Sequence, residues 1–486
     1  MYRPVTDAML SEVTGPCDFP VVVQPVERLG VAACATSSLT RYKATPEDVL
    51  ASRERDDTPM PFLIEAARVD PGDTAWIIVC TALVLLMTPG LAFFYAGMVR
   101  SKHALAMIMQ SFVTIAIVSV TWVLVGYSLA FDRDAGGGLV GGLHLVGLSH
   151  AEVAVPGMDL SIPPLAFVTF QMMFAILTAA LLSGAVADRM RFGAFVTFIA
   201  IWSVVVYAPL AHWAWSPQGW LNKAGLLDFA GGTVVEICSG ASALALALVL
   251  GPRRGWPREM MAPHNLPLTL LGAGLLWFGW IGFNAGSALS AGGLAASAAL
   301  ATHLSGVGGM IGWLALERRL TGKATTLGAA TGAVAGLVAV TPAAGFLAPL
   351  PALLLGTIAG VASLFAIRLK FRFRYDDSLD VVAVHYVGGV IGTLFIGLFA
   401  SVAVNPAVRH QGLLLGGGLT QLARQGLGVL AATAFAFTAT YAIARVLRAT
   451  IGLRVEPDDE IEGLDSSQHA ETAYEFTATS GLGRVS

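Results

Sequence analysis

The chain has 486 residues, of which 55% are hydrophobic and only 13% are charged, with a formal net charge of −3. A soluble protein of this length needs far more charged surface, and the mean hydropathy is +0.70, so lipid must be the solvent for most of the chain. The four cysteines form no CxxC pair, and no nucleotide motif is present, so we expect no metal site, no disulfide framework, no cofactor and no nucleic-acid partner.

From Thr74 onward the sequence is a series of apolar segments of about 20 residues, the length that crosses the hydrocarbon core of a bilayer. We therefore predict an all-α integral membrane protein with eleven transmembrane helices. The predicted spans lie near residues 74-99, 104-131, 163-187, 193-213, 229-251, 267-287, 294-316, 326-346, 349-369, 380-402 and 424-447.

The loops between the spans indicate how the chain is oriented. Basic residues follow the odd-numbered spans, as Arg100 and Lys102 follow the first and Arg253 follows the fifth. The alternate loops, such as 131-142 and 342-351, have few or none. Because positive charge stays on the cytoplasmic side, we expect the N-terminus outside and the C-terminus in the cytoplasm.

Residues 1-72 do not share this pattern, because they are charged and contain several prolines but no long apolar run. They are either an N-terminal extension, external or disordered, or a mis-assigned start upstream of Met60. Residues 73-452 are expected to form the transmembrane domain, and residues 453-486 a cytoplasmic regulatory tail.

The fifth and tenth spans resemble each other. Asp228 opens the fifth span eight residues before Glu236, and Asp377 opens the tenth eight residues before His385. Small residues follow three and four positions beyond Glu236 and beyond His385. We therefore predict two inverted five-helix repeats plus a final helix, with the substrate site between the repeats near the membrane midplane.

Glu236 and His385 are ionisable residues inside predicted spans, where a charge costs about 2.5 kcal/mol or more. One interpretation is that they face each other across a narrow path and share a proton or bind a polar solute. The other is a helix–helix hydrogen bond that only holds the bundle together. We favour the functional interpretation, because intramembrane carboxylates are more often functional.

Three acids and two tryptophans lie at span ends. For Asp377 and Asp380 we predict helix N-capping, whereas Asp228 could cap a helix or set the electrostatics of a nearby cation site. Trp213 and Trp215 could offer a cation–π face, but the sequence alone favours an interfacial belt. Phe174 and Phe283 would, from the residues alone, be packing residues.

Eight stretches, taken together and in this order, resemble the Amt/Mep/Rh ammonium transporter family, and most of all its bacterial Amt branch. The resemblance runs from residue 73 to residue 474 and leaves 1-72 uncovered. The stretches are 73-102, 184-192, 227-237, 263-267, 279-288, 335-342, 380-389 and 452-474.

The resemblance implies an eleven-helix pore in the cell (inner) membrane, assembled as a homotrimer with one pore per subunit. Phe174, Trp215 and Ser287 would then form the external ammonium recruitment site. Phe174 and Phe283 would form a stacked phenyl gate below it. Asp228 would be needed for activity without contacting the ligand.

The pore pair departs from the family pattern. His385 matches the second of the paired pore histidines, but Glu236 stands where most Amt proteins have the first. A glutamate can also accept and return a proton, and some fungal members resemble this chain in carrying an acid there. Tyr386 replaces a common glycine, so we expect it to narrow the pore lining.

The resulting hypothesis is electrogenic ammonium uptake, in which ammonium is recruited and deprotonated, ammonia crosses the pore, and the proton passes along Glu236 and His385. The main alternative is an ammonium sensor that signals through a P-II protein, because 463-465 and 469-474 resemble the Amt tail that contacts such proteins. A neutral gas channel, as in the Rh branch, and an intramembrane enzyme are less favoured.

Overall fold

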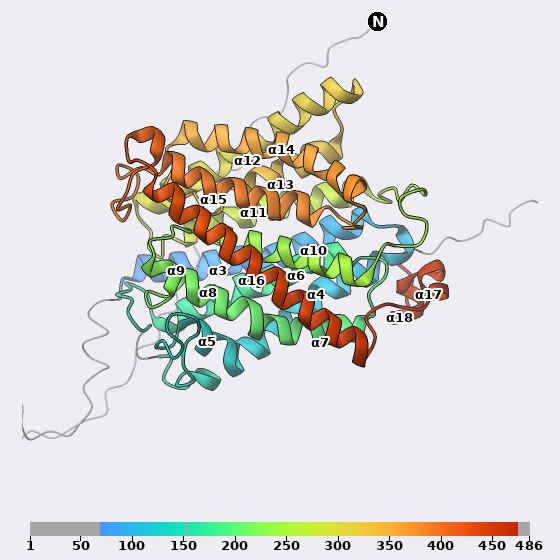
Figure 1. Cartoon of the computed structure of the whole chain (residues 1–486), viewed down its shortest axis with the longest axis horizontal. Coiled ribbons are helices and arrows are strands. Elements are labelled where there is room, and N and C mark those ends of the chain that lie inside the picture. The colour runs from blue at the N-terminus through green and yellow to red at the C-terminus, as the bar shows by residue number, and fades with distance from the viewer. Residues whose placement is uncertain (1–68, 153–154, 475–486) are drawn as a thin grey trace, which may run out of the picture. The chain divides into compact units, whose positions relative to one another are not determined.

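The structure, a computed structural model, describes residues 69–152 and 155–474, and over these residues the chain is built from helices (Figure 1). Two isolated β-bridges, Asp134–Gly141 and Met190–Arg454, are the extended pairings found in this part. Most of the segment 1-72 for which we predicted an extension lies outside the described residues.

The helices before the tail are α3 (Pro71–Met98), α4 (Ala104–Thr121), α5 (Tyr127–Phe131), α6 (Pro164–Val186), α7 (Phe192–Trp202), α8 (Ala208–Trp215), α9 (Trp220–Lys223), α10 (Cys238–Leu250), α11 (Leu266–Gly286), α12 (Gly293–Thr321), α13 (Thr326–Val340), α14 (Pro349–Phe373), α15 (Val387–Phe399) and α16 (Thr420–Thr450). Most of the long ones run roughly along one axis in Figure 1, and α16 crosses them obliquely. Two short helices follow in the tail, α17 (Pro457–Glu462) and α18 (Leu464–His469).

Ten helices in the described part are long and apolar enough to cross a membrane, whereas eleven spans were predicted. The difference is the predicted span 326-346, which forms the 15-residue helix α13 followed by turns. A helix of that length is about 22 Å long, less than the roughly 30 Å of a hydrocarbon core. Most of α13 is buried, with close contacts to α11, α12 and α14.

Four of the predicted spans contain a π-helical turn, in which the backbone is wider than in an α-helix. The turns η3 (Trp122–Gly126) and η5 (Ser203–Tyr207) interrupt the second and fourth spans. The turns η6 (Gly232–Ile237) and η7 (Val382–Tyr386) begin the helices that continue as α10 and α15. Such turns often occur at functional sites.

Glycines allow the helices to approach closely, as in other membrane bundles. A Cβ at Gly356 of α14 would lie 2.0 Å from the carbonyl oxygen of Ser305 in α12. A Cβ at Gly272 of α11 would lie 2.2 Å from the backbone nitrogen of Phe94 in α3. At both places the glycine is required by the contact between backbones.

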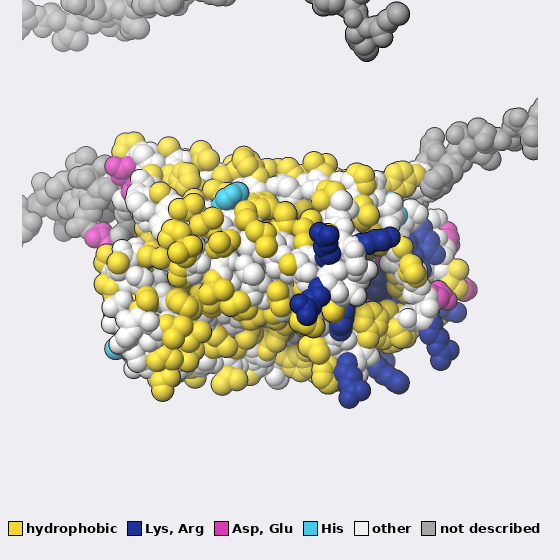
Figure 2. Space-filling model, turned by 90° about the horizontal axis from the view of Figure 1, so that it is seen from above, with side chains coloured by type: hydrophobic (Ala, Val, Ile, Leu, Met, Phe, Trp, Pro, Cys, Tyr) yellow, Lys and Arg dark blue, Asp and Glu magenta, His cyan; other side chains and the backbone are white. Residues whose placement is uncertain are grey.

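One end of the bundle, which we call the basic end, carries the end of α3 and the tail helices α17 and α18 (Figure 1). Figure 2 shows Lys and Arg side chains gathered toward this end. Beneath them the buried Asp376 accepts from the backbone N–H of Arg253 at 2.7 Å and from its guanidinium at 2.9 Å. The fully buried Arg189 donates to the carbonyl of Asp376 at 2.6 Å. The loops of the basic end are therefore joined by buried charges.

The tail is docked on the basic end. Glu460 accepts from the backbone N–H of Arg254 at 2.6 Å and from the side chain of Arg454 at 2.7 Å. Asp465 accepts from the backbone N–H groups of Leu105 and Ala106 at 3.1 and 2.8 Å, so it caps the start of α4. The tail therefore contacts the loops between the membrane helices.

Candidate functional site

Glu236 and His385 lie in contact inside the bundle. Nδ1 of His385 is 2.7 Å from Oε2 of Glu236, and the two residues are 4% and 1% exposed, respectively. When Glu236 is ionised, Nδ1 must carry the hydrogen of this bond, because a carboxylate only accepts. The structure thus brings together two residues 149 positions apart in the chain.

The small residues beyond each member of the pair hold the two segments against each other. A Cβ at Gly240 would lie 2.5 Å from the backbone nitrogen of Tyr386, next to His385. A Cβ at Gly389 would lie 2.7 Å from Cβ of Glu236. The contacts are reciprocal, which explains why both segments carry glycine at the same offset.

Asp228 caps the turn that carries Glu236. Its carboxylate accepts from the backbone N–H groups of Gly231, Gly232 and Thr233 at 2.8, 2.6 and 2.7 Å, and from the Thr233 hydroxyl. Its backbone carbonyl accepts from Nε1 of Trp215 at 3.1 Å. Of the two interpretations that the sequence left open for Asp228, the geometry is that of a cap.

Asp377 also acts as a cap, as predicted, because its Oδ2 accepts from the backbone N–H of Val382 at 2.7 Å. The same prediction for Asp380 is wrong. Asp380 has a φ of +63°, and its Oδ1 lies 2.5 Å from Nζ of Lys370. The side chain is therefore used in an ion pair, and it lines a cavity beside His385.

An outer cavity of about 130 Å³ lies near the end of the bundle opposite the basic end. Phe174, Trp215 and Ser287 line it, so Trp215 forms a wall of a cavity rather than only an interfacial belt. The hydroxyl of Ser287 donates to the carbonyl of Phe283 at 2.8 Å, which leaves its oxygen as an acceptor toward the cavity.

Phe174, which lines this cavity, is stacked on a second phenyl ring, that of Phe283. The rings of Phe174 and Phe283 are stacked, with centroids 4.1 Å apart and an interplanar angle of 30°. Trp215 meets Phe174 edge-on at 5.8 Å. Both phenylalanines are fully or almost fully buried.

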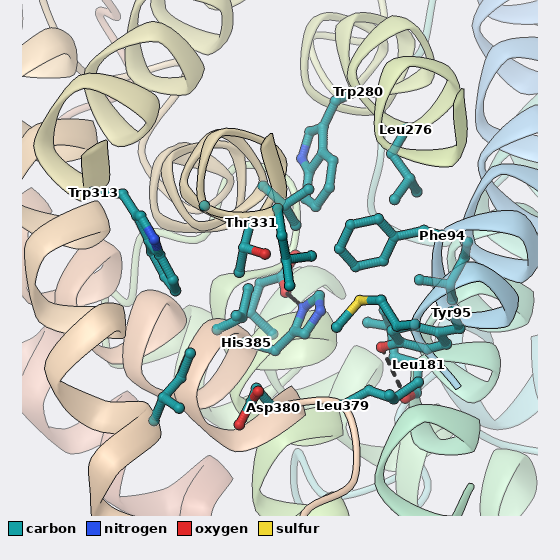
Figure 3. Close-up of a pocket in the computed structure, with 18 of the residues that line it drawn as sticks. Phe94, Tyr95, Leu181, Leu276, Trp280, Trp313, Thr331, Leu379, Asp380 and His385 are labelled. Carbon is teal, nitrogen blue, oxygen red and sulfur yellow. Dashed lines mark hydrogen bonds and ion pairs between the residues drawn. The ribbon is translucent and has the colours of Figure 1, made fainter. Parts of the chain in front are cut away.

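An inner cavity of about 120 Å³ reaches the pair and extends toward the basic end (Figure 3). Trp313, Glu317 and Thr331 line it, and sequence reasoning missed all three. Their residue types are ordinary for a packed helix or its polar end, and no spacing marks them as neighbours of His385. Only long-range packing brings them to this cavity.

Tyr386 does not narrow this cavity, contrary to the prediction. It is not among the residues that line the inner cavity, and its hydroxyl lies 3.3 Å from Oγ1 of Thr433 in α16. Within residues 69–152 and 155–474, no group of three His, Cys, Asp or Glu residues could hold a metal ion.

The chain is similar to known proteins over most of its length. A model of the Ammonium Transporter Family matches residues 75–474. An ammonium transporter of Mycobacterium tuberculosis is 48% identical over 439 residues, which cover 85% of this chain and 92% of that protein.

Two solved structures are similar over most of the chain. The crystal structure of Saccharomyces cerevisiae Mep2 has a TM-score of 0.78 and 35% identity, and the match covers 85% of this chain and 94% of that one. A structure described as a sensor Amt protein has a TM-score of 0.74 and 30% identity, over 82% of this chain and 98% of that one.

Proposed function

The chain belongs to the ammonium transporter family, a family of multi-pass membrane transporters rather than enzymes, and we propose that it carries ammonium across the cell membrane. In this proposal ammonium is recruited at the outer cavity and deprotonated, ammonia crosses the pore, and the proton passes along Glu236 and His385. The observation that carries it is the buried 2.7 Å contact between Glu236 and His385, between an outer and an inner cavity.

Recruitment is assigned to Phe174, Trp215 and Ser287. The indole of Trp215 offers a face to a cation, and the Ser287 oxygen offers an acceptor. The hydrogen bond from Trp215 to the carbonyl of Asp228 fixes the ring in place. Asp228 thus acts by positioning Trp215 and η6. Both oxygens of its carboxylate accept hydrogen bonds from backbone N–H groups.

Phe174 and Phe283 are assigned the gate. Their stacked rings must move apart for a solute to pass, and the gap that they leave is apolar. An ion would lose its water there, at a cost of several kcal/mol, whereas ammonia is neutral. The gate therefore favours deprotonation before passage.

Glu236 and His385 are assigned the proton relay. Proton transfer needs a donor and an acceptor within hydrogen-bond reach, and the 2.7 Å contact satisfies this. Glu236 occupies the place of the first pore histidine in most members of the family. A carboxylate can take up and return a proton there as an imidazole can.

The remaining proposals concern the architecture. With α13 and its following turn counted as a span, residues 73-452 form eleven spans, arranged as two inverted five-helix repeats and a final helix. The positive-inside rule puts the basic end and the tail 453-486 in the cytoplasm, with the N-terminus outside. We further propose a homotrimer in the cell (inner) membrane and leave 1-72 as an extension or a mis-assigned start.

The decisive experiment compares the wild type with Glu236→His and Glu236→Ala in cells that lack ammonium uptake and grow on low ammonium. We expect growth with the wild type and with Glu236→His, and none with Glu236→Ala. Ammonium-elicited current in proteoliposomes measures the charge carried. If Glu236→Ala transports as well as the wild type, the relay role of Glu236 is wrong; if the wild type transports without current, the solute is the neutral gas.

A second candidate function is an ammonium sensor that signals through a P-II protein with little flux. The docked tail and the likeness to a sensor Amt protein favour it. A sensor would bind such a partner in an ammonium-dependent way while its current stayed near background. A large current together with complementation would reject the sensor.

A further inference from the structure

Two glutamines are buried in α16, the long helix that crosses the others obliquely in Figure 1. Gln421 and Gln425 are 1% and 0% exposed, and they lie one helical turn apart near the start of the helix. A side-chain amide that is buried in an apolar bundle costs free energy unless its polar atoms find hydrogen-bond partners. The partners of these two amides therefore show which parts of the chain they hold.

Gln425 makes all four of the hydrogen bonds that a side-chain amide can make. Its Nε2 donates to the carbonyl of Leu227 at 2.7 Å and to the carbonyl of Thr393 at 3.2 Å. Its Oε1 accepts from the backbone N–H of Leu227 at 2.9 Å and from Nε2 of Gln421 at 2.9 Å. An amide has two N–H donors and an oxygen with two lone pairs, so every polar position is used. The amide thus binds both backbone groups of Leu227 and joins them to α15.

The two segments that Gln425 joins each belong to one arm of the buried pair. Leu227 immediately precedes Asp228, the cap of η6. Thr393 lies in α15, the helix that continues η7. The two arms also touch directly, because a Cβ at Gly232 of η6 would lie 2.7 Å from Oγ1 of Thr393. One buried amide therefore connects the start of η6 with the helix that follows η7.

The segment that the amide holds also forms part of the outer cavity. Asp228 and Phe229 follow Leu227 in the chain. The carbonyl of Asp228 accepts from Nε1 of Trp215 at 3.1 Å, and Phe229 lines the cavity together with Trp215. The backbone N–H of Phe229 donates to the carbonyl of Pro342 at 3.0 Å. The place of Leu227 therefore determines where two walls of the outer cavity stand.

We propose that Gln425 is a positioning residue for ammonium transport. It fixes the backbone at Leu227, and through it the ring of Trp215 in the outer cavity and the turn η6 that carries Glu236. Gln425 is not among the residues that line the outer or the inner cavity, so it acts through the backbone that it holds and not on the solute. The inference rests on the proposed function and adds to it a residue of α16.

Gln421 holds the same segment with fewer bonds. Its Nε2 donates to the carbonyl of Gly225 at 3.1 Å and to Oε1 of Gln425 at 2.9 Å. Because Gln425 keeps its three backbone bonds when Gln421 is changed, the loss of Gln421 weakens the hold on the segment without releasing it. The two glutamines therefore offer a strong and a weak form of the same change.

The test uses Gln425→Met, which keeps the approximate length of the side chain and removes all four hydrogen bonds, and Gln421→Met, which removes two. Ammonium-elicited current is measured in proteoliposomes over a range of external ammonium concentrations. We expect the half-saturating concentration to rise about three- to tenfold for Gln425→Met and about twofold for Gln421→Met, because Trp215 loses its support. The maximal current should also fall for Gln425→Met, because η6 no longer holds Glu236 in place.

The half-saturating concentration separates positioning from a loss of folded protein. Fewer folded molecules lower the maximal current but leave the half-saturating concentration unchanged. The matched control is Gln110→Met, since Gln110 of α4 is also a buried glutamine, 3% exposed, and is not among the residues that line either cavity. This control should keep the wild-type half-saturating concentration.

A second experiment tests whether Gln425 acts through Trp215. Trp215→Leu alone should raise the half-saturating concentration. Adding Gln425→Met to it should raise that concentration no further, because the ring that depends on the held segment is already gone. A further rise as large as that of Gln425→Met alone would mean that Gln425 acts by another route, and the proposed positioning of Trp215 would be wrong.

The outcomes separate this inference from the proposed function. If the wild type conducts ammonium and Gln425→Met keeps the wild-type half-saturating concentration, Gln425 is only structural, so the inference is wrong and the proposed function stands. If Gln425→Met does not fold, Gln421→Met decides by the same measure, and an unchanged half-saturating concentration there overturns the inference. If the wild type conducts nothing, the proposed function fails and the inference fails with it.

Discussion

The two π-helical turns that carry Glu236 and His385, η6 and η7, have the same local geometry but different surroundings. Each begins a membrane helix, each is capped by an aspartate, and each presents one member of the pair. Asp228, the cap of η6, is half-buried and has both oxygens satisfied. Asp377, the cap of η7, is 1% exposed, and its Oδ1 has no partner among the described residues. The geometry of a turn can thus be repeated while its electrostatics differ.

The largest expected effect concerns the buried ion pair between Asp376 and Arg253, which lies next to the cap of η7 in the sequence. Asp376→Ala removes the carboxylate that bonds the buried guanidinium of Arg253 at 2.9 Å and leaves it only the more distant Asp188, at 3.7 Å, so we expect the free energy of unfolding to fall by about 3–5 kcal/mol. Denaturant unfolding of the purified protein measures it. The double variant Arg253→Met/Asp376→Ala should recover part of the loss. A loss below about 1 kcal/mol for the single variant would contradict this account.

The next effect concerns the titration of Asp377, the cap of η7. Burial, followed by repulsion from Asp380, raises the pKa of Asp377 from its ordinary 3.8 to about 6. The folded state therefore binds this proton more tightly than the unfolded state, and ionisation destabilises the fold. Stability contributed by the neutral carboxyl is lost as pH rises from about 4 to about 6, by about 3 kcal/mol in all.

Asp377→Asn should remove this loss, because an amide stays neutral and can still accept from the N–H of Val382. The variant should be more stable than the wild type at pH 7 to 8, and the difference between them should shrink below pH 5. Thermal unfolding at a series of pH values measures both. An unchanged difference across the whole range would mean that Asp377 does not titrate there.

The smallest of the three effects concerns Asp228, the cap of η6. Asp228→Ala removes the acceptor for three backbone N–H groups and for the Thr233 hydroxyl, so stability should fall by about 2 kcal/mol. Ammonium current should fall as well, because η6 and Trp215 lose their support. Asp228→Asn, which keeps an acceptor, should lie between the two. If Asp228→Ala kept both stability and current, the positioning role would be wrong.

Much of the site could be predicted, because its signals were local. Glu236 and His385 are unusual residues within apolar spans, and their equal distance from an aspartate indicated that they occupy matching positions. The grouping of Phe174, Trp215 and Ser287 came only from the family resemblance, because nothing in the spacing of an aromatic and a serine predicts a shared cavity.

What could not be predicted depends on contacts between distant segments. The ion pair of Asp380 with Lys370 replaced the expected cap, because a left-handed φ turns the carboxylate away from the helix start. Trp313 has no local signal at all. Helix ends were also misjudged where polar residues continue a helix beyond its apolar part, as in α12, which reaches Thr321 instead of 316.

The π-helical turns also limit which substitutions and deletions this part of the chain can accept. A π-helical turn closes its hydrogen bond one residue later than an α-turn, so it holds one extra residue in a single wider turn. Removing one residue from η6 would replace this turn by an ordinary α-turn and change the backbone that holds Glu236 against Gly389. Exchanging the side chain at position 236 leaves the turn intact. This segment can therefore tolerate a different side chain at position 236 far more readily than a change in length.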